Sequence, residues 1–276
     1  MCLSVASLNS GSNGNCYYLA SENAAVLIDV GISCKEIEKR MQRLGLSMQK
    51  IKAVFITHEH TDHVYGLASF LKKYPLPVYI TNKTLQKIYV PQNLAYSFNT
   101  HTAITINDLI ITAFPKLHDA ADPCSFVVTC NNITVGIFTD IGLPCNNVIN
   151  YFKQCNAAFL EANYDAAMLH KGGYPFVLKK RISGGYGHLS NTEALELFIK
   201  HKASFMTHLF LSHLSYNNNT PEIAETLFNT HAEGVQVILA SRFKETDVHL
   251  INSNHQQFIK PYIKPLKPTQ LKLAFA

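Results

Sequence analysis

The apolar residues of this chain fall mainly in short runs bounded by glycine, proline, asparagine or aspartate. Short runs of this kind, continuous or alternating, are typical of β-strands. We predict strands at residues 2–8, 16–20, 25–29, 51–57, 78–81, 104–114, 125–130, 133–139, 157–161, 204–211 and 235–240. The pair Asn131-Asn132 between two of these runs favours a tight hairpin turn.

In other segments the apolar residues recur at helical spacing. Within residues 34–44, Ile37, Met41 and Leu44 fall on one face, and Gly45 follows as a stop signal. Comparable signals predict further helices at residues 64–74, 84–89, 190–200 and 221–231.

The order of these elements predicts an α/β protein. Strands that follow one another closely, with helices after them, favour two sheets sandwiched between helices. No internal repeat, low-complexity tract or long linker interrupts the chain, so we predict one domain covering residues 1–276. The stretch from Arg242 onward is less regular, and we expect edge strands there at most.

Composition narrows the class of protein. Of the 276 residues, 47% are hydrophobic and 16% are charged, which is typical of a globular protein with a large core. No apolar tract reaches the roughly 18–20 residues of a membrane span, and the N-terminus lacks the basic segment of a signal peptide. We therefore expect no membrane partner.

Cysteine usage and net charge add two weaker constraints. The seven cysteines are odd in number and include no Cys-x-x-Cys pair, which indicates reduced thiols in a cytoplasmic protein and excludes a zinc ribbon. The formal net charge of +5 permits a polyanionic substrate but does not require one.

The strongest chemical signal is the sequence His-x-His-x-Asp-His at residues 58–63, directly after a predicted buried strand. Imidazoles and carboxylates are typical ligands of zinc, iron and similar ions. Where the chain leaves the strand, His58 and His60 can face one ion. Asp62 and His63, at the start of a helix, can face another. The motif predicts a two-metal site, and a histidine-rich surface loop is the alternative.

A two-metal site needs further ligands from other strand ends. His118, Asp140 and His213 each follow a predicted strand. A single histidine after a strand is more often an ordinary surface residue. Three such residues in one chain favour a shared role as metal ligands.

In this order, the residues Asp29, His58, His60, Asp62, His63, His118, Asp140 and His213 resemble the metallo-β-lactamase superfamily. The sequence Leu-Ile-Asp-Val-Gly at residues 27–31 is similar to the first motif of that superfamily. The resemblance implies a four-layer αβ/βα sandwich, the metallo-β-lactamase fold. It also implies two divalent metal ions, with zinc as the first choice and manganese or iron as alternatives.

The resemblance also implies how the ligands are shared. His58, His60 and His118 would hold one ion. The other ion would be held by Asp62, His63 and His213. Asp140 would bridge the two ions, and Asp29 would orient the site without binding metal.

Asp140 separates the branches of the superfamily. The best-known zinc enzymes that hydrolyse antibiotics carry a cysteine there, whereas glyoxalase II, lactonases, phosphodiesterases and nucleases usually carry an aspartate. The local sequences at residues 10–15, 161–165, 187–191 and 213–219 are similar to the compact bacterial branch called WalJ or YycJ. Ile141 is a small departure, since that branch often has a threonine at this place.

This resemblance implies a metal-dependent phosphodiesterase or nuclease, similar to a DNA exonuclease, with nucleic acid as substrate and DNA favoured over RNA. We expect Asp62, Asp140 and His188 to be catalytic. Asp62 or Asp140 would orient a water activated by the two ions, and His188 would protonate the leaving alkoxide or hold a phosphoryl oxygen. The alternative is hydrolysis of a small ester, thioester or lactone. A third possible function is that of a metal-binding regulatory or redox protein.

Several sequence features stay open. His188 is either this acid, an ordinary residue ahead of a helix capped by Ser190 or Asn191, or a competitor of His213 for metal. The basic run at residues 179–181 either contacts phosphates or forms a solvated loop. The glycine-rich loop at residues 10–15 either offers N–H groups to a phosphate or is a plain hairpin turn. Arg242 is a weaker candidate for phosphate binding.

Overall fold

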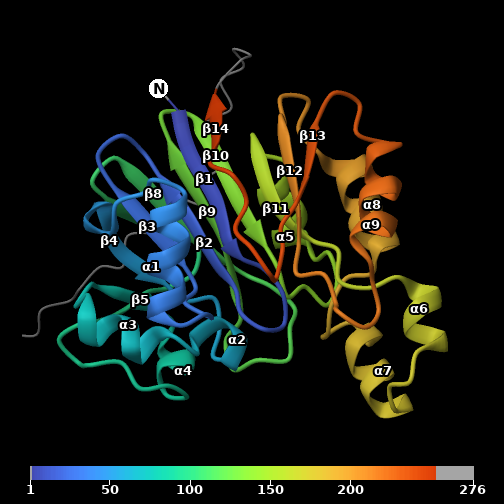
Figure 1. Ribbon diagram of the computed structural model, residues 1–276, viewed down its shortest axis with the longest axis horizontal. Helices are drawn as coiled ribbons and strands as arrows, with labels where there is room; N and C mark the ends of the chain where they lie inside the picture. Colours follow the sequence, from blue (N-terminus) through green and yellow to red (C-terminus); the bar gives the residue numbers. More distant parts are fainter. Residues whose placement is uncertain (1, 253–276) are drawn as a thin grey trace, which may run out of the picture.

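The computed structural model describes residues 2–252, and within them the strands form two seven-stranded sheets (Figure 1). The first sheet runs, in spatial order, through β14 (His249–Asn252), β1 (Cys2–Asn9), β2 (Cys16–Ala20), β3 (Ala25–Ile28), β4 (Ile51–Phe55), β5 (Val78–Ile80) and β6 (Ala95–Ser97). The second runs through β13 (Gln236–Leu239), β12 (His208–Ser212), β11 (Ala157–Glu161), β10 (Ile133–Phe138), β9 (Cys124–Cys130), β8 (Leu109–Pro115) and β7 (Ala103–Ile106).

Helices cover the outer faces of both sheets (Figure 1). On the first sheet lie α1 (Cys34–Arg43), α3 (Leu67–Lys73) and α4 (Asn82–Leu85), and on the second α5 (Asn146–Phe152), α8 (Asn191–His201) and α9 (Pro221–Asn229). The remaining helical segments are η1 (Met48–Lys50), α2 (Thr61–Val64), α6 (Ala166–Lys171) and α7 (Phe176–Ser183). This is the four-layer αβ/βα sandwich of the metallo-β-lactamase fold, so the predicted fold class is confirmed.

Three apolar layers hold the sandwich together. Phe55, Phe126 and Phe159 belong to the layer between the two sheets, where they are fully buried. Ile37 in α1 packs against the first sheet, and Phe198 in α8 packs against the second. Burial of apolar surface on both faces of each sheet explains why these strands read as continuous apolar runs rather than alternating ones.

The strand directions bring the ends of distant segments to one edge of the sandwich. β3, β4 and β5 are mutually parallel, and so are β10, β11, β12 and β13. The loops that leave the carboxyl ends of these strands therefore meet between the two sheets. Polar groups in open α/β sheets commonly gather at such ends.

The structure corrects several predicted boundaries. Residues 104–114 are not one strand but a hairpin of β7 and β8, turning at Asn107, whose φ is +55°. Residues 64–74 are split between α2 and α3. The strand predicted from residue 204 begins at His208, and the helix predicted at residues 84–89 is the shorter α4. The basic run at residues 179–181 is helical, within α7, rather than a loop.

The C-terminal stretch behaves as predicted where it is described. β14 pairs antiparallel with β1 at the edge of the first sheet. Residues 253–276, the last part of the predicted domain, lie outside the described residues. Among residues 2–252, no helix is both long and apolar enough to cross a membrane.

Candidate metal centre

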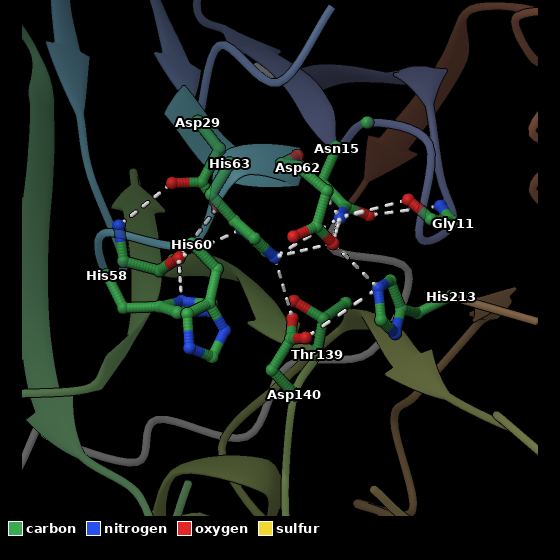
Figure 2. A network of polar contacts seen from close by, with 12 residues as sticks. Gly11, Asn15, Asp29, His58, His60, Asp62, His63, Thr139, Asp140 and His213 are labelled. Atoms are coloured by element: carbon green, nitrogen blue, oxygen red, sulfur yellow. Dashed lines mark hydrogen bonds and ion pairs between the residues drawn. The ribbon is translucent and has the colours of Figure 1, made fainter. Parts of the chain in front are cut away.

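Three of the predicted ligands converge in a first group. The Nε2 atom of His58 lies 3.1 Å from Nδ1 of His60, two residues that Figure 2 shows next to each other. The same nitrogen of His60 lies 3.3 Å from Nε2 of His118. Two nitrogens bound to one tetrahedral zinc ion at about 2.0–2.1 Å stand roughly 3.3 Å apart. The three imidazoles are therefore spaced as ligands of one ion.

The other predicted ligands form a second group. His63 Nε2 lies 3.5 Å from Asp62 Oδ2 and 3.2 Å from Asp140 Oδ2. His213 Nε2 lies 3.4 Å from Asp62 Oδ2 and 3.6 Å from Asp140 Oδ1. Mixed nitrogen and oxygen donors at these separations also suit one divalent ion.

Asp140 lies between the two groups. Besides its contacts to His63 and His213, its Oδ1 is 3.9 Å from Nε2 of His118, a member of the first group. The carboxylate is 2% exposed, and within residues 2–252 the one contact of its Oδ2 that replaces a hydrogen bond is the ion pair to His63 at 3.2 Å. A buried carboxylate surrounded by imidazole nitrogens and without a hydrogen bond to this oxygen fits a metal ligand.

The backbone at this edge is strained at three site residues. Asp29, Asp140 and His213 have φ values of +62°, +55° and +56°. Residues other than glycine rarely adopt such values, and those that do cluster at functional sites. Here each strained residue lies just past the end of a strand, where the turn aims its side chain into the centre.

The electrostatics of the site favour bound cations. Burial works against the charged form of His63, but the carboxylates of Asp140, Asp29 and Asp62 outweigh it and raise the pKa of His63 well above its usual value. Burial also works against the charged form of His213, but the negative charge of Asp140 and the other carboxylates outweighs it and raises the pKa of His213 to about 10. The buried carboxylates thus demand positive charge nearby. A divalent ion supplies that charge and leaves the imidazoles neutral to act as ligands.

Asp29 organises the motif from behind. Its Oδ1 accepts a hydrogen bond from Thr57 N at 2.8 Å, and its Oδ2 accepts one from Thr57 Oγ1 at 2.8 Å. Oδ2 also lies 2.7 Å from Nδ1 of His63 (Figure 2), so the other ring nitrogen points to Asp62 and Asp140. This arrangement agrees with the orienting role expected for Asp29.

The glycine-rich loop at residues 10–15 supports the ligands. Asn15 Nδ2 lies 3.2 Å from both Asp62 Oδ2 and His63 Nε2. Ser10 Oγ accepts a hydrogen bond from the backbone N–H of His213 at 2.8 Å. The loop is thus more than a plain hairpin turn, because it holds the metal ligands in place. Neither of the two roles that the sequence suggested for it, a hairpin turn or a phosphate-binding loop, included this support.

Glu161 is a site residue that the sequence analysis did not nominate. It is fully buried at the end of β11, and its Oε1 lies 2.7 Å from His188 Nδ1 and 3.0 Å from His213 Nδ1. Its Oε2 accepts hydrogen bonds from the N–H groups of Ile141 and Leu189. Although burial opposes ionisation, the two histidines lower the pKa of Glu161 to about 2. Its position at the end of a strand was the signal that could have identified it.

His188 is placed close to both groups. Its Nδ1 lies 3.9 Å from Asp140 Oδ1, and its side chain is 22% exposed, so it reaches the surface beside the ligands. Ser190, two residues later, caps α8 as the sequence suggested. The structure therefore combines a helix cap at Ser190 with a position of His188 close to the metal centre. The geometry also allows His188 to act as a metal ligand, the third role suggested by the sequence. Its donor atoms are close enough to hold an ion together with those of Asp140, Glu161 and His213.

The basic residues of α7 are largely engaged within the protein. Arg181 Nε lies 2.5 Å from Asp119 Oδ2, and Lys179 Nζ donates to the carbonyl oxygen of His170 at 2.7 Å. These contacts give no support to phosphate binding by this run.

Comparison with known proteins agrees with this geometry. Residues 10–88 match the family described as the metallo-beta-lactamase superfamily. The chain is 32% identical to exodeoxyribonuclease YycJ of Bacillus anthracis over 222 residues, which cover 79% of this chain and 84% of that protein. It is 30% identical to exodeoxyribonuclease WalJ of Streptococcus pneumoniae, over 82% of this chain and 87% of that one.

Solved structures support the fold. The metallo-beta-lactamase fold protein YhfI from Bacillus subtilis superimposes with a TM-score of 0.70 at 18% identity, covering 91% of this chain and all of that chain. At this level of identity, the likeness extends to the fold alone.

Proposed function

This chain belongs to the metallo-beta-lactamase superfamily, and on that premise we propose that it is a two-metal phosphodiesterase acting on nucleic acid. The observation that carries the proposal is the position of Asp140 between two groups of histidine-containing donors. A carboxylate there suits two ions held close together, the arrangement of the two-metal sites in phosphatases and nucleases. The names of the relatives YycJ and WalJ favour exonuclease action on DNA.

We infer that His58, His60 and His118 would hold one ion, that Asp62, His63 and His213 would hold the other, and that Asp140 would be shared between them. When bound, such ions lower the pKa of a water towards neutrality and neutralise charge on phosphoryl oxygens. Histidine with carboxylate donors suits zinc first, with manganese or iron as alternatives.

The remaining steps belong to the side chains around the ions. Asp62, which is part exposed and held by Asn15, is placed to orient the attacking water. The Nδ1 atom of His188 is hydrogen-bonded to the buried carboxylate of Glu161. The Nε2 atom of the protonated ring is therefore free to donate its proton to the leaving alkoxide. This pairing of a buried carboxylate with a half-buried imidazole is typical of general acids, which contribute roughly 10²–10⁴-fold to rates.

The test compares the wild type with Asp140→Ala. Purified metal-loaded protein is incubated with end-labelled single- and double-stranded DNA and RNA, with bis-p-nitrophenyl phosphate, and with a thioester. We expect cleavage of nucleic acid by the wild type and a loss of at least about 100-fold in Asp140→Ala, because a shared ligand is removed. Metal content is measured in parallel.

Asp108→Asn is the matched control, since this carboxylate bonds Ser21 at the opposite edge of the second sheet. It should cleave like the wild type. Equal cleavage by Asp140→Ala and wild type would refute the metal mechanism. Rapid thioester hydrolysis without cleavage of any nucleic acid would refute the nuclease proposal and favour the small-ester alternative.

A further inference from the structure

Three side chains gather beside the loop at residues 10–15 that supports the metal ligands: Tyr216, Arg242 and Phe243, here called the Arg242 cluster. The guanidinium carbon of Arg242 lies 5.1 Å from the centre of the Tyr216 ring and 6.0 Å from that of Phe243. The rings themselves meet edge to face at 6.3 Å. Tyr216 is 67% exposed and Phe243 is 71% exposed. The cluster therefore presents two aromatic surfaces to solvent around one cation.

Arg242 lacks an anionic partner within the protein. Among residues 2–252 it forms no ion pair, and its Nη1 is buried without a hydrogen-bond partner. The nearest carboxylate along the chain, Glu245, is bound to Arg43 at 2.6 Å instead. A guanidinium stays protonated and presents a planar fork of donors that matches phosphate oxygens. The residue as a whole is part exposed, and among residues 2–252 its Nε and Nη2 also form no hydrogen bond, so the guanidinium has donors left for an anion from outside the chain.

The cluster is attached to the loop that supports the metal ligands. Ser10 donates its N–H to the carbonyl oxygen of Ser241 at 3.1 Å, and its hydroxyl accepts from the N–H of His213 at 2.8 Å. Arg242 follows Ser241 directly, and Tyr216 lies three residues after His213. Two segments that leave neighbouring strands, β12 and β13, thus carry the cluster to the loop at residues 10–15, which also holds the backbone of His213.

The same loop fixes the backbone of the cluster. Asn13 Nδ2 donates to the carbonyl oxygen of Arg242 at 3.0 Å, and Phe243 N donates to Ser241 Oγ at 3.1 Å. A side-chain methyl at Gly11, whose φ is +144°, would come within 3.2 Å of Arg242 Cβ. The glycine therefore allows the close approach of loop and cluster, and Figure 2 shows Gly11 bonded to Asn15 beside Asp62.

We propose that the Arg242 cluster is a nucleotide subsite for an unpaired strand next to the scissile bond. Arg242 binds a backbone phosphate, and the exposed rings of Tyr216 and Phe243 stack on bases. This proposal rests on the proposed nuclease function and names the form of its substrate. Stacking on aromatic side chains tolerates every base, so the subsite selects single strands without selecting a sequence.

Binding is measured by fluorescence anisotropy of a labelled 12-nucleotide single strand, as DNA and as RNA, on chelator-treated full-length protein. Tyr216→Leu should weaken binding roughly 5- to 100-fold, and Tyr216→Phe should restore most of it, because the ring remains. Arg242→Gln should weaken binding and reduce the slope of log Kd against log salt concentration by about 0.7, the value of one phosphate contact on a single strand.

The matched control for the loss of charge is Lys52→Gln. Lys52 is exposed near the amino end of β4, opposite the metal centre, so Kd and the salt slope should stay at wild-type values. A blunt duplex should bind more weakly than the single strand. The same variants are then assayed as metal-loaded enzymes for KM and kcat on the oligonucleotide.

Wild-type cleavage together with unchanged Kd in Arg242→Gln and Tyr216→Leu would overturn the subsite while leaving the nuclease function in place. Equal binding of single strand and duplex would overturn the stacking role. A wild type that neither binds nor cleaves nucleic acid would end the proposed function, and the subsite with it.

Discussion

At the scale of single residues, Asp29 shows how a side chain that binds no metal can govern one that does. Its carboxylate accepts from Thr57 and lies against His63, and its positive φ points it there. An asparagine at this position would keep the backbone, because asparagine tolerates positive φ, but its amide nitrogen cannot accept a hydrogen bond. We expect Asp29→Asn to lower metal affinity about 10- to 100-fold. Competition with a chromogenic chelator measures this, and wild-type affinity would contradict the orienting role.

The residues of the site were predictable where they follow a strand. His118, Asp140 and His213 could be nominated because side chains after parallel strands collect at one edge. Glu161 carried a weaker form of the same signal, as a carboxylate at the last position of an apolar strand, but the sequence does not show that this strand lies beside the one that precedes His213. Asn15 was hidden for a related reason, since its partners Asp62 and His63 are remote in sequence.

At the scale of elements, local signals decided what could be predicted. The turn at Asn131-Asn132 has positive φ at both residues, as the asparagine pair indicated, and it joins β9 to β10. The hairpin of β7 and β8 was missed because its turn residues, Asn107 and Asp108, lie within an otherwise apolar stretch. α7 was missed because it buries none of its residues, so its sequence carries no clear apolar face.

The cap of α8 offers a test of how an element positions a catalytic group. Ser190 Oγ accepts from Glu193 N at 3.2 Å, and Glu193 accepts in return from Ser190 N at 2.8 Å. Ser190→Ala should reduce the free energy of unfolding by about 1 kcal/mol, as measured in urea. It should also lower kcat, since His188 lies two residues ahead of the cap.

Thr220→Ala is the control for this prediction. Thr220 caps α9 through Ile223 N in the same way but borders no site residue. It should lose similar stability without a change in kcat. If both variants lower kcat alike, the cap of α8 has no special influence on His188.

At the scale of the whole molecule, the segment between β13 and β14 joins the two halves of the sandwich. It leaves the second sheet at Leu239 and ends on the edge of the first, beside β1. On the way it carries Arg242 past the loop at residues 10–15 and places Glu245 against α1. The sequence showed this stretch only as irregular, because its order comes from contacts with residues some two hundred positions away.

Glu245 gives this crossing a pH dependence. Both oxygens of its carboxylate accept hydrogen bonds from Arg43 at 2.6 Å. These bonds lower the pKa of Glu245, and burial, which would raise the pKa, has a smaller effect. The pKa of Glu245 is therefore lower in the folded protein than in the unfolded chain, where it is about 4.3. The ionised carboxylate stabilises the fold fully above about pH 4.3, and this stabilisation is lost as the pH falls through the pKa of the folded state. Because Arg43 is exposed, solvent screens the pair, and we expect it to contribute at most about 1 kcal/mol to the free energy of unfolding.

Glu245→Gln should therefore be less stable than the wild type at pH 7, and the difference should shrink towards zero as the pH falls below the unfolded pKa of about 4.3 and through the lower folded pKa. Urea unfolding of chelator-treated protein at each pH measures it, so that release of metal does not enter the comparison. Glu196→Gln, which breaks an exposed pair with Lys200 within α8, should change stability by only about 0.3 kcal/mol. A difference for Glu245→Gln that persists unchanged at the acid end of this range would mean that its carboxylate stabilises the crossing by packing rather than by charge.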